Sequence, residues 1–167
     1  MVTVLAGLIL GCGGAPDVPT LDDADPTRRK EALYGLGPEG VRAELEGVMG
    51  IAARDPEPTI RRLALGLLGP TGDPRVVPLL KDALLTWDDT SMQLTAATAL
   101  GNVQHVAACP VMVEAFVVWP SERDPVLASL RSSLVASDPL CNDTMRERKS
   151  ERPDRIGPVL LEISRSR

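Results

Sequence analysis

The sequence predicts an all-α fold, specifically an α-solenoid (superhelix) of about four stacked helix pairs. Three features predict it: an internal repeat, apolar residues at helical spacing within each repeat, and a core built from small aliphatic side chains. Hydrophobic residues make up 44% of the 167-residue chain, whereas aromatic residues make up only 2%. Such a composition favours close packing of helix on helix over packing of sheet on sheet.

The repeat consists of an alanine, a leucine and a glycine that recur at a constant interval. In each copy the leucine follows the alanine by four positions, and the glycine comes next. The members of each set are 32 residues apart: Ala32, Ala64 and Ala96; Leu36, Leu68 and Leu100; Gly37, Gly69 and Gly101. A period of this length indicates one supersecondary unit per repeat, with neighbouring units stacked on one another.

Each unit is expected to contain two helices. Acidic residues should cap the first helices, at Asp25, Asp55 and the pair Asp88-Asp89. In the second unit the apolar residues form one stripe, at Ile60, Leu63, Ala64, Leu67 and Leu68. We expect the glycine after the last leucine to end the first helix in a left-handed conformation. Second helices are then expected over 38–53, 74–85 and 111–119.

Residues 72–80 read Gly-Asp-Pro-Arg-Val-Val-Pro-Leu-Leu. With the paired helices around it, this segment resembles HEAT repeats, and in particular the short repeats of phycobilisome lyase-like proteins. The resemblance covers 25–141 and implies a module that binds or scaffolds other proteins, with second helices on the side where partners dock. Residues 142–167 depart from the pattern, and we expect them to form a degenerate cap followed by a basic tail.

The first ten residues form an apolar run that ends at Gly11-Cys12. This order resembles the signal and lipobox of bacterial lipoproteins. The resemblance implies a signal peptide over 1–11, a lipidated Cys12 as the membrane anchor, and a flexible tether over 12–24. The protein would then be exported and anchored at the periplasmic face of the outer membrane. No Lys or Arg precedes the run, and the alternative is a frayed terminal element with a buried thiol.

Cys109 and Cys141 are also separated by one repeat, so they should occupy equivalent places in adjacent units. An oxidising compartment would permit a disulfide between them, provided that loop ends bring their Cα atoms within about 7 Å. The alternative is a pair of buried thiols. His105 and Asp138 nearby suggest a zinc site, but without CxxC or HxxxH spacing we favour structural roles and expect no metal.

The third unit's second helix is apolar on nearly all sides, with Glu114 as its only charge. Either other parts of the chain cover it, residues 156–164 being the candidate, or it presents an apolar patch to a partner. The repeat register places Met49, Lys81 and Val113 in one row and Asp82 beside Glu114. The predicted partner-binding residues are Met49, Lys81, Asp82, Val113, Glu114, Val117 and Trp119.

The sequence contains no recognisable catalytic constellation, because it has one histidine, no Gly-x-Ser-x-Gly and no phosphate-binding loop. Its formal net charge of −5 argues against nucleic-acid binding. We therefore expect a non-enzymatic envelope scaffold that needs no cofactor and binds an unidentified protein. Two alternatives are a lyase-like or chaperone-like accessory protein, and a structural spacer without a specific ligand.

Overall fold

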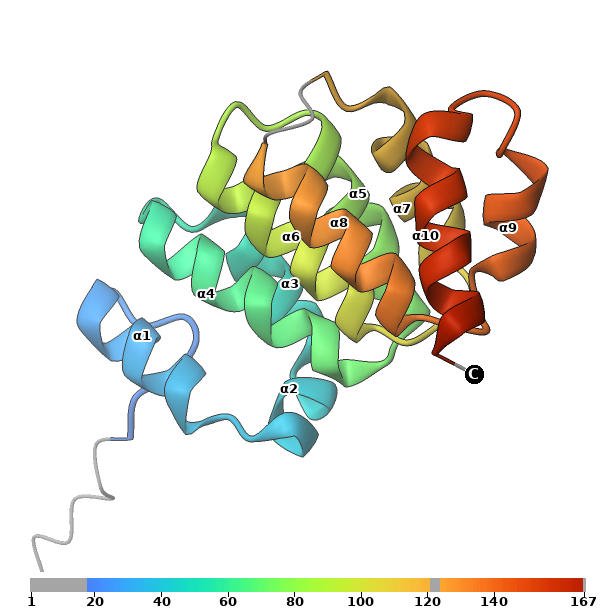
Figure 1. The fold of residues 1–167 in the computed structure, drawn as a ribbon. Coiled ribbons are helices and arrows are strands. Elements are labelled where there is room, and N and C mark those ends of the chain that lie inside the picture. Colours follow the sequence, from blue (N-terminus) through green and yellow to red (C-terminus); the bar gives the residue numbers. More distant parts are fainter. Residues whose placement is uncertain (1–17, 121–123, 167) are drawn as a thin grey trace, which may run out of the picture.

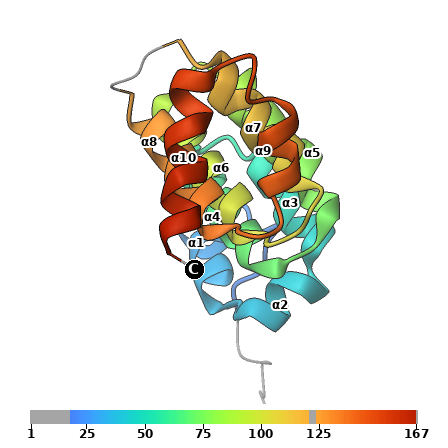
Figure 2. The same ribbon diagram turned by 45° about the vertical axis from the view of Figure 1, so that its right-hand side comes forward.

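The computed structural model describes residues 18–120 and 124–166. All the regular structure in these ranges is helical, and the helices stack in two layers (Figures 1 and 2). The first layer contains α1 (Pro26–Gly35), α4 (Pro58–Leu68), α6 (Thr90–Asn102), α8 (Pro125–Ala136) and α10 (Pro153–Arg165). The second contains α2 (Pro38–Ala43), α3 (Leu45–Arg54), α5 (Val77–Leu85), α7 (Ala108–Val118) and α9 (Asn142–Glu147). Two short 3-10 helices, η1 (Gly69–Thr71) and η2 (Pro74–Val76), join α4 to α5.

The stack follows the predicted repeat. Each second-layer helix packs against the first helix of the next unit, so that α3 contacts α4, α5 contacts α6 and α7 contacts α8. Ala64 and Ala96 are fully buried at matching places, as are Leu68 and Leu100. The predicted α-solenoid is therefore confirmed. No helix in the described part of the chain is long and apolar enough to cross a bilayer.

Two of the three predicted acidic caps are present. Asp25 accepts a hydrogen bond from the Thr27 amide at 2.8 Å, and Asp89 accepts one from the Ser91 amide at 2.8 Å. The prediction for Asp55 is wrong, because α4 begins three residues later with Glu57 at its cap position. The Asp55 carboxylate instead binds the side chain of Arg29.

The prediction that the repeat glycines adopt a left-handed conformation is also wrong. Gly69 has φ −54° and ψ −57°, Gly37 is extended, and Gly101 lies inside α6. A Cβ on Gly69 would lie 2.8 Å from the Ala99 carbonyl oxygen, and one on Gly101 would lie 2.5 Å from the Ser133 hydroxyl oxygen. These two glycines are therefore needed because the next first-layer helix passes too close for any side chain.

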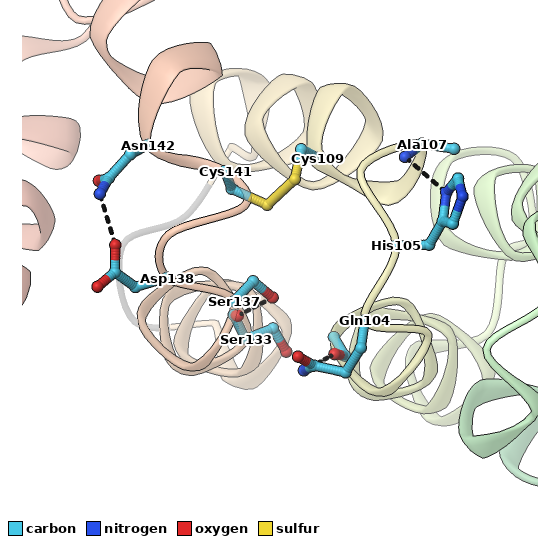
Figure 3. Close-up of a disulfide and its surroundings, with 10 residues drawn as sticks. Gln104, His105, Ala107, Cys109, Ser133, Ser137, Asp138, Cys141 and Asn142 are labelled. Atoms are coloured by element: carbon cyan, nitrogen blue, oxygen red, sulfur yellow. Dashed lines mark hydrogen bonds between the residues drawn. A yellow bond between two sulfur atoms is a disulfide. The ribbon is translucent and has the colours of Figure 1, made fainter.

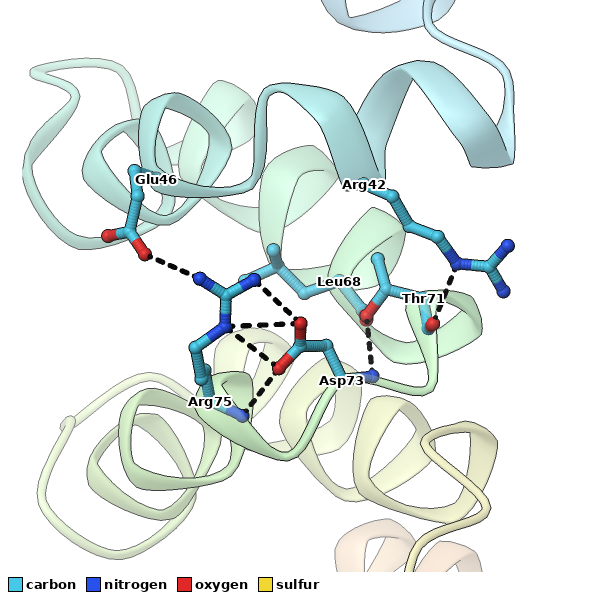
Figure 4. A network of polar contacts seen from close by, with 6 residues as sticks. All are labelled: Arg42, Glu46, Leu68, Thr71, Asp73 and Arg75. Carbon is cyan, nitrogen blue, oxygen red and sulfur yellow. Dashed lines mark hydrogen bonds and ion pairs between the residues drawn. The ribbon is translucent and has the colours of Figure 1, made fainter.

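The second helix of the first unit does not run unbroken over 38–53. It breaks at Glu44 into α2 and α3. Arg42 on α2 donates a hydrogen bond from Nε to the Thr71 carbonyl at 2.9 Å, which ties α2 to η1 in the next unit (Figure 4).

Both ends of the stack differ from the sequence-based expectation. Leu21, within the predicted tether over 12–24, packs against the core. The Arg29 guanidinium also donates to the carbonyls of Asp23 and Ala24 at 2.9 and 3.1 Å, so residues 21–24 are held by α1. At the other end, the predicted basic tail contains α10, which packs on α8 as an additional first-layer helix.

Candidate functional site

Only some of the predicted partner-binding residues on the second helices lie at the surface. Lys81 and Asp82 are exposed on α5, Glu114 on α7 is partly exposed, and Met49 on α3 is half-buried. The Lys81 ammonium lies 3.1 Å from the Glu114 carboxylate, so the ion pair joins α5 to α7. The register had placed Asp82 beside Glu114, but Asp82 accepts hydrogen bonds from the Thr86 hydroxyl and the Trp87 indole. These polar side chains remain accessible to a partner.

The proposed apolar patch on α7 is not exposed. Val113 is fully buried, and Val117 and Trp119 are only 7% and 8% exposed. The last two helices of the chain both pack on α7, and Arg155 of α10 donates to the carbonyls of Phe116 and Trp119 at 3.0 and 2.7 Å. Since α5, α6 and α8 also contact α7, the alternative of a covered helix is confirmed, with the end of the chain supplying part of the cover. Val113, Val117 and Trp119 do not form a partner-binding surface.

Cys109 and Cys141 form a disulfide in the structure, with Cα atoms 5.1 Å apart (Figure 3). Cys109 lies in the first turn of α7 and Cys141 directly precedes α9, so the bond joins the starts of two stacked second helices. Ends of helices can approach to this distance, whereas the middles of stacked helices stay about 8–10 Å apart. The disulfide thus fastens the last second-layer helix to the unit before it.

The side chains that suggested zinc are engaged in other contacts (Figure 3). His105 Nδ1 accepts a hydrogen bond from the Ala107 amide at 3.1 Å, and the Asn142 side-chain amide donates to the Asp138 carboxylate. Both cysteine sulfurs are in the disulfide. Within residues 18–120 and 124–166, no three His, Cys, Asp or Glu side chains are grouped so that they could hold a metal ion.

The Gly-Asp-Pro-Arg segment forms a polar network between the first and second units (Figure 4). Asp73 caps η2 by accepting from the Arg75 amide at 2.9 Å, and its carboxylate also binds the Arg75 guanidinium at 2.8 Å. Arg75 holds the pKa of Asp73 below its ordinary value through these hydrogen bonds. Arg75 also reaches Glu46 on α3 at 3.4 Å. The network orders the turn within the second unit and connects it to the first.

A buried ion pair joins the first two units. The Arg29 guanidinium binds the Asp55 carboxylate through two hydrogen bonds, of 2.7 and 3.0 Å. The carboxylate also accepts from the Glu57 amide at 2.9 Å. The hydrogen bonds from Arg29 lower the pKa of Asp55 below its ordinary value. Asp55 is 6% exposed, so the pair belongs to the core at the N-terminal end of the stack.

A groove of about 880 Å³ opens at the N-terminal end of the stack. It runs between α1 and α3 and is bordered by the segment that precedes α1. Its apolar lining includes Leu21, Ala32, Leu36 and Ile51, and the two α3 glycines, Gly47 and Gly50, also line it. We call this feature the N-terminal groove. A volume of this size lies within the range of pockets that hold ligands.

The sequence-based reasoning missed the N-terminal groove, although the repeat contained a signal for it. Ala32 and Leu36 belong to the buried set of the repeat, yet both are partly exposed. Their counterparts Ala64 and Leu68 have no exposed surface. The difference arises because α1 is the first helix of the described stack and has no second-layer helix packed before it.

Comparison with protein families agrees with this architecture. The family model of HEAT repeats matches residues 45–131, which is more than half of the chain. The chain therefore belongs to the HEAT-repeat family. No curated protein matches the sequence.

Proposed function

We propose that this protein is a non-catalytic, protein-binding scaffold of the bacterial cell envelope. The observation that best supports the proposal is that the histidine and two of the cysteines, which could carry out chemistry, make structural contacts instead. The chain's single histidine binds a backbone amide, and two of its three cysteines are joined. The accessible features are the polar row on α3, α5 and α7, and the N-terminal groove. HEAT stacks generally mediate protein interaction or scaffolding, and both features are suited to that role.

Two observations support placing the scaffold in the envelope. The apolar run, Gly11 and Cys12 resemble a lipoprotein signal, although these residues lie outside the described part of the chain. The Cys109–Cys141 disulfide adds independent support, because disulfides persist in oxidising compartments such as the periplasm and are rare in the cytosol. Under this proposal Cys12 carries the lipid and the protein faces the periplasm from the outer membrane.

Incorporation of radiolabelled palmitate tests the anchor. The full-length protein should be labelled and recovered with membranes, whereas Cys12→Ala should be unlabelled. Cys109→Ala provides the matched control and should retain the label. Equal labelling of all three proteins, or labelling of none, would exclude Cys12 as the lipid attachment site.

Site-specific photo-cross-linking in cells tests the scaffold. A photoreactive residue in place of Asp82 should give one discrete cross-linked product, because Asp82 is exposed on the second layer. The same residue in place of Thr98, exposed on α6 in the first layer, should not give that product. Diffuse products from both positions would favour a structural spacer instead. The lyase-like alternative rests only on the resemblance of residues 72–80, and an exported location disfavours it.

A further inference from the structure

The N-terminal groove lies where a further second-layer helix would pack. In every later unit a first-layer helix is contacted by the second-layer helix of the unit before it, as α3 contacts α4. Two later pairs of second-layer helices also contact one another, α5 with α7 and α7 with α9. A helix placed before α1 would therefore contact both α1 and α3. Those are the two helices that line the groove.

The floor of the groove is suited to an apolar helix face. Ala32 on α1 and Leu36, directly after α1, occupy the same repeat positions that α4 and α6 use in the core. On α3, Gly50 provides a floor without a side chain, which lets a neighbouring helix approach closely. The Leu21 side chain lies beside it over Gly47, where an added Cβ would be 3.2 Å from Leu21 Cδ1. Burying this floor under an apolar helix face would remove apolar surface from water, which is favourable.

The rim of the groove is predominantly acidic. Among the residues that line it are five carboxylates, Asp22, Asp23, Glu44, Glu46 and Asp55, and two guanidinium groups, Arg29 and Arg54. Arg29 is already bound to Asp55, and Asp23 to Arg28. Glu46 is bound to Arg75, and Arg54 adds one exposed positive charge. Asp22 and Glu44 are exposed. They would attract a partner that carries Lys or Arg.

We propose that the N-terminal groove binds an amphipathic helix of another protein, with aliphatic residues on one face and lysine or arginine residues beside that face. The aliphatic face takes the place of a preceding second-layer helix on Ala32, Leu36 and Gly50, beside Leu21. The basic residues lie against Asp22 and Glu44. The inference rests on the proposed protein-binding function and names the chemistry of one partner.

The chain's own residues 1–17 are a poorer occupant. They contain no Lys or Arg to meet the acidic rim, and Gly11, Gly13, Gly14 and Pro16 interrupt the last seven residues of this sequence segment. Glycine and proline disfavour a helix there. A partner in trans therefore fits the groove's charge better than this segment does.

The test uses the full chain and a labelled synthetic peptide of about 14 residues, roughly four helical turns. The peptide carries leucines at i, i+3, i+4 and i+7 with lysines at both sides, and fluorescence anisotropy measures binding. One control peptide has the same composition in scrambled order. A second control peptide has glutamate in place of lysine. We expect a dissociation constant on the order of 10 µM for the first peptide and no measurable binding for the controls.

Two variants of the protein locate the site. Gly50→Leu fills the floor, and its Cβ would meet only the flexible end of Arg54, at 3.2 Å, so the fold should be kept. Glu44→Lys reverses charge on the rim. Gly50→Leu should weaken peptide binding by about tenfold or more, and Glu44→Lys by about threefold. Gly66→Leu, at an exposed glycine of α4, and Glu147→Lys, on α9, are the matched controls and should bind normally.

Three results would overturn the proposal. The first is equal binding of the scrambled peptide, or unchanged binding by Gly50→Leu. The second is binding that appears only after residues 1–17 are removed, which would make that segment the occupant. The third is a dimer of the full chain that Gly50→Leu dissociates, which would make a second copy the occupant. A discrete cross-link at Asp82 that persists in any of these cases would preserve the scaffold function and exclude only this groove.

Discussion

Small residues determine how closely the units of this stack approach. Gly69 and Gly101 recur with the repeat, and each lies where the next first-layer helix leaves no space for a Cβ. A Cβ added to Gly66, which lies on α4 three residues before Gly69, would be 3.8 Å from its nearest neighbour, Thr95 Cγ2. Glycine is therefore required at Gly69, directly after α4, but not at Gly66 on α4.

We predict that Gly69→Ala lowers the free energy of unfolding by about 1–3 kcal/mol, because the added Cβ collides with the backbone of Ala99. Gly66→Ala, in contrast, should stabilise the protein by roughly 0.5–1 kcal/mol by improving helix propensity. Urea denaturation followed by circular dichroism measures both changes. Equal effects from the two substitutions would contradict the role assigned to Gly69.

The buried pair of Arg29 and Asp55 makes stability depend on pH. Since Arg29 lowers the pKa of Asp55 in the folded protein, the pair stabilises the fold at any pH above the ordinary aspartate value of about 3.9. This contribution is lost as the pH falls below about 4 toward the depressed pKa of the folded state. Asp55→Asn should remove this part of the pH dependence.

At neutral pH, Asp55→Asn should cost about 1–3 kcal/mol, because the Arg29 guanidinium loses its carboxylate and keeps only the carbonyls of Asp23 and Ala24 as partners. Glu39→Gln is the control, because Glu39 pairs with Arg42 at the surface. Loss of this ion pair should lower the free energy of unfolding by about 0–1 kcal/mol. Urea denaturation at pH 7 and at several values below pH 4 measures both effects. An Asp55→Asn variant as stable as the parent at pH 7 would refute the structural role of this pair.

Of the helices, α9 depends most on the Cys109–Cys141 disulfide to hold its position. It is a six-residue helix, and Asn142 and Met145 are its only buried residues. The disulfide before its first residue holds it against the start of α7. So short and polar a helix would not persist without such a constraint.

We predict that the double variant Cys109→Ala, Cys141→Ala loses about 3–4 kcal/mol of stability, as expected for a bond that closes a loop of this length. Reducing agent should lower the melting temperature of the parent and leave that of the variant unchanged. Amide hydrogen exchange should show the greatest loss of protection in α9. A variant as stable as the oxidised parent would contradict this role.

For the whole molecule, the end of the stack determines what remains accessible. The helix α7 has almost no polar surface of its own, and α10 supplies part of its cover. Arg155 binds the last carbonyl groups of α7 at the same time. The C-terminal segment is thus a structural part of the solenoid, which needs a terminal helix with a polar outer face.

Removal of residues 153–167 should expose Phe116 and Trp119. We expect the shortened protein to bind the dye ANS strongly and to self-associate in gel filtration, because an exposed apolar patch promotes aggregation. Removal of Ser166 and Arg167 alone is the control and should change neither property. A monomeric shortened protein without dye binding would show that α10 is not a cap.

The sequence by itself determined the helix pairs, their period and their stacking order, because the 32-residue recurrence of alanine and leucine specifies the same buried stripe in successive units. Only the tertiary structure decided which apolar surfaces are free. Val113 and Ala32 both belong to apolar helix faces, yet α7 is enclosed by neighbours whereas α1 is the first helix in the described part of the chain. Exposure depends on these distant neighbours, and periodicity within one helix carries no information about them.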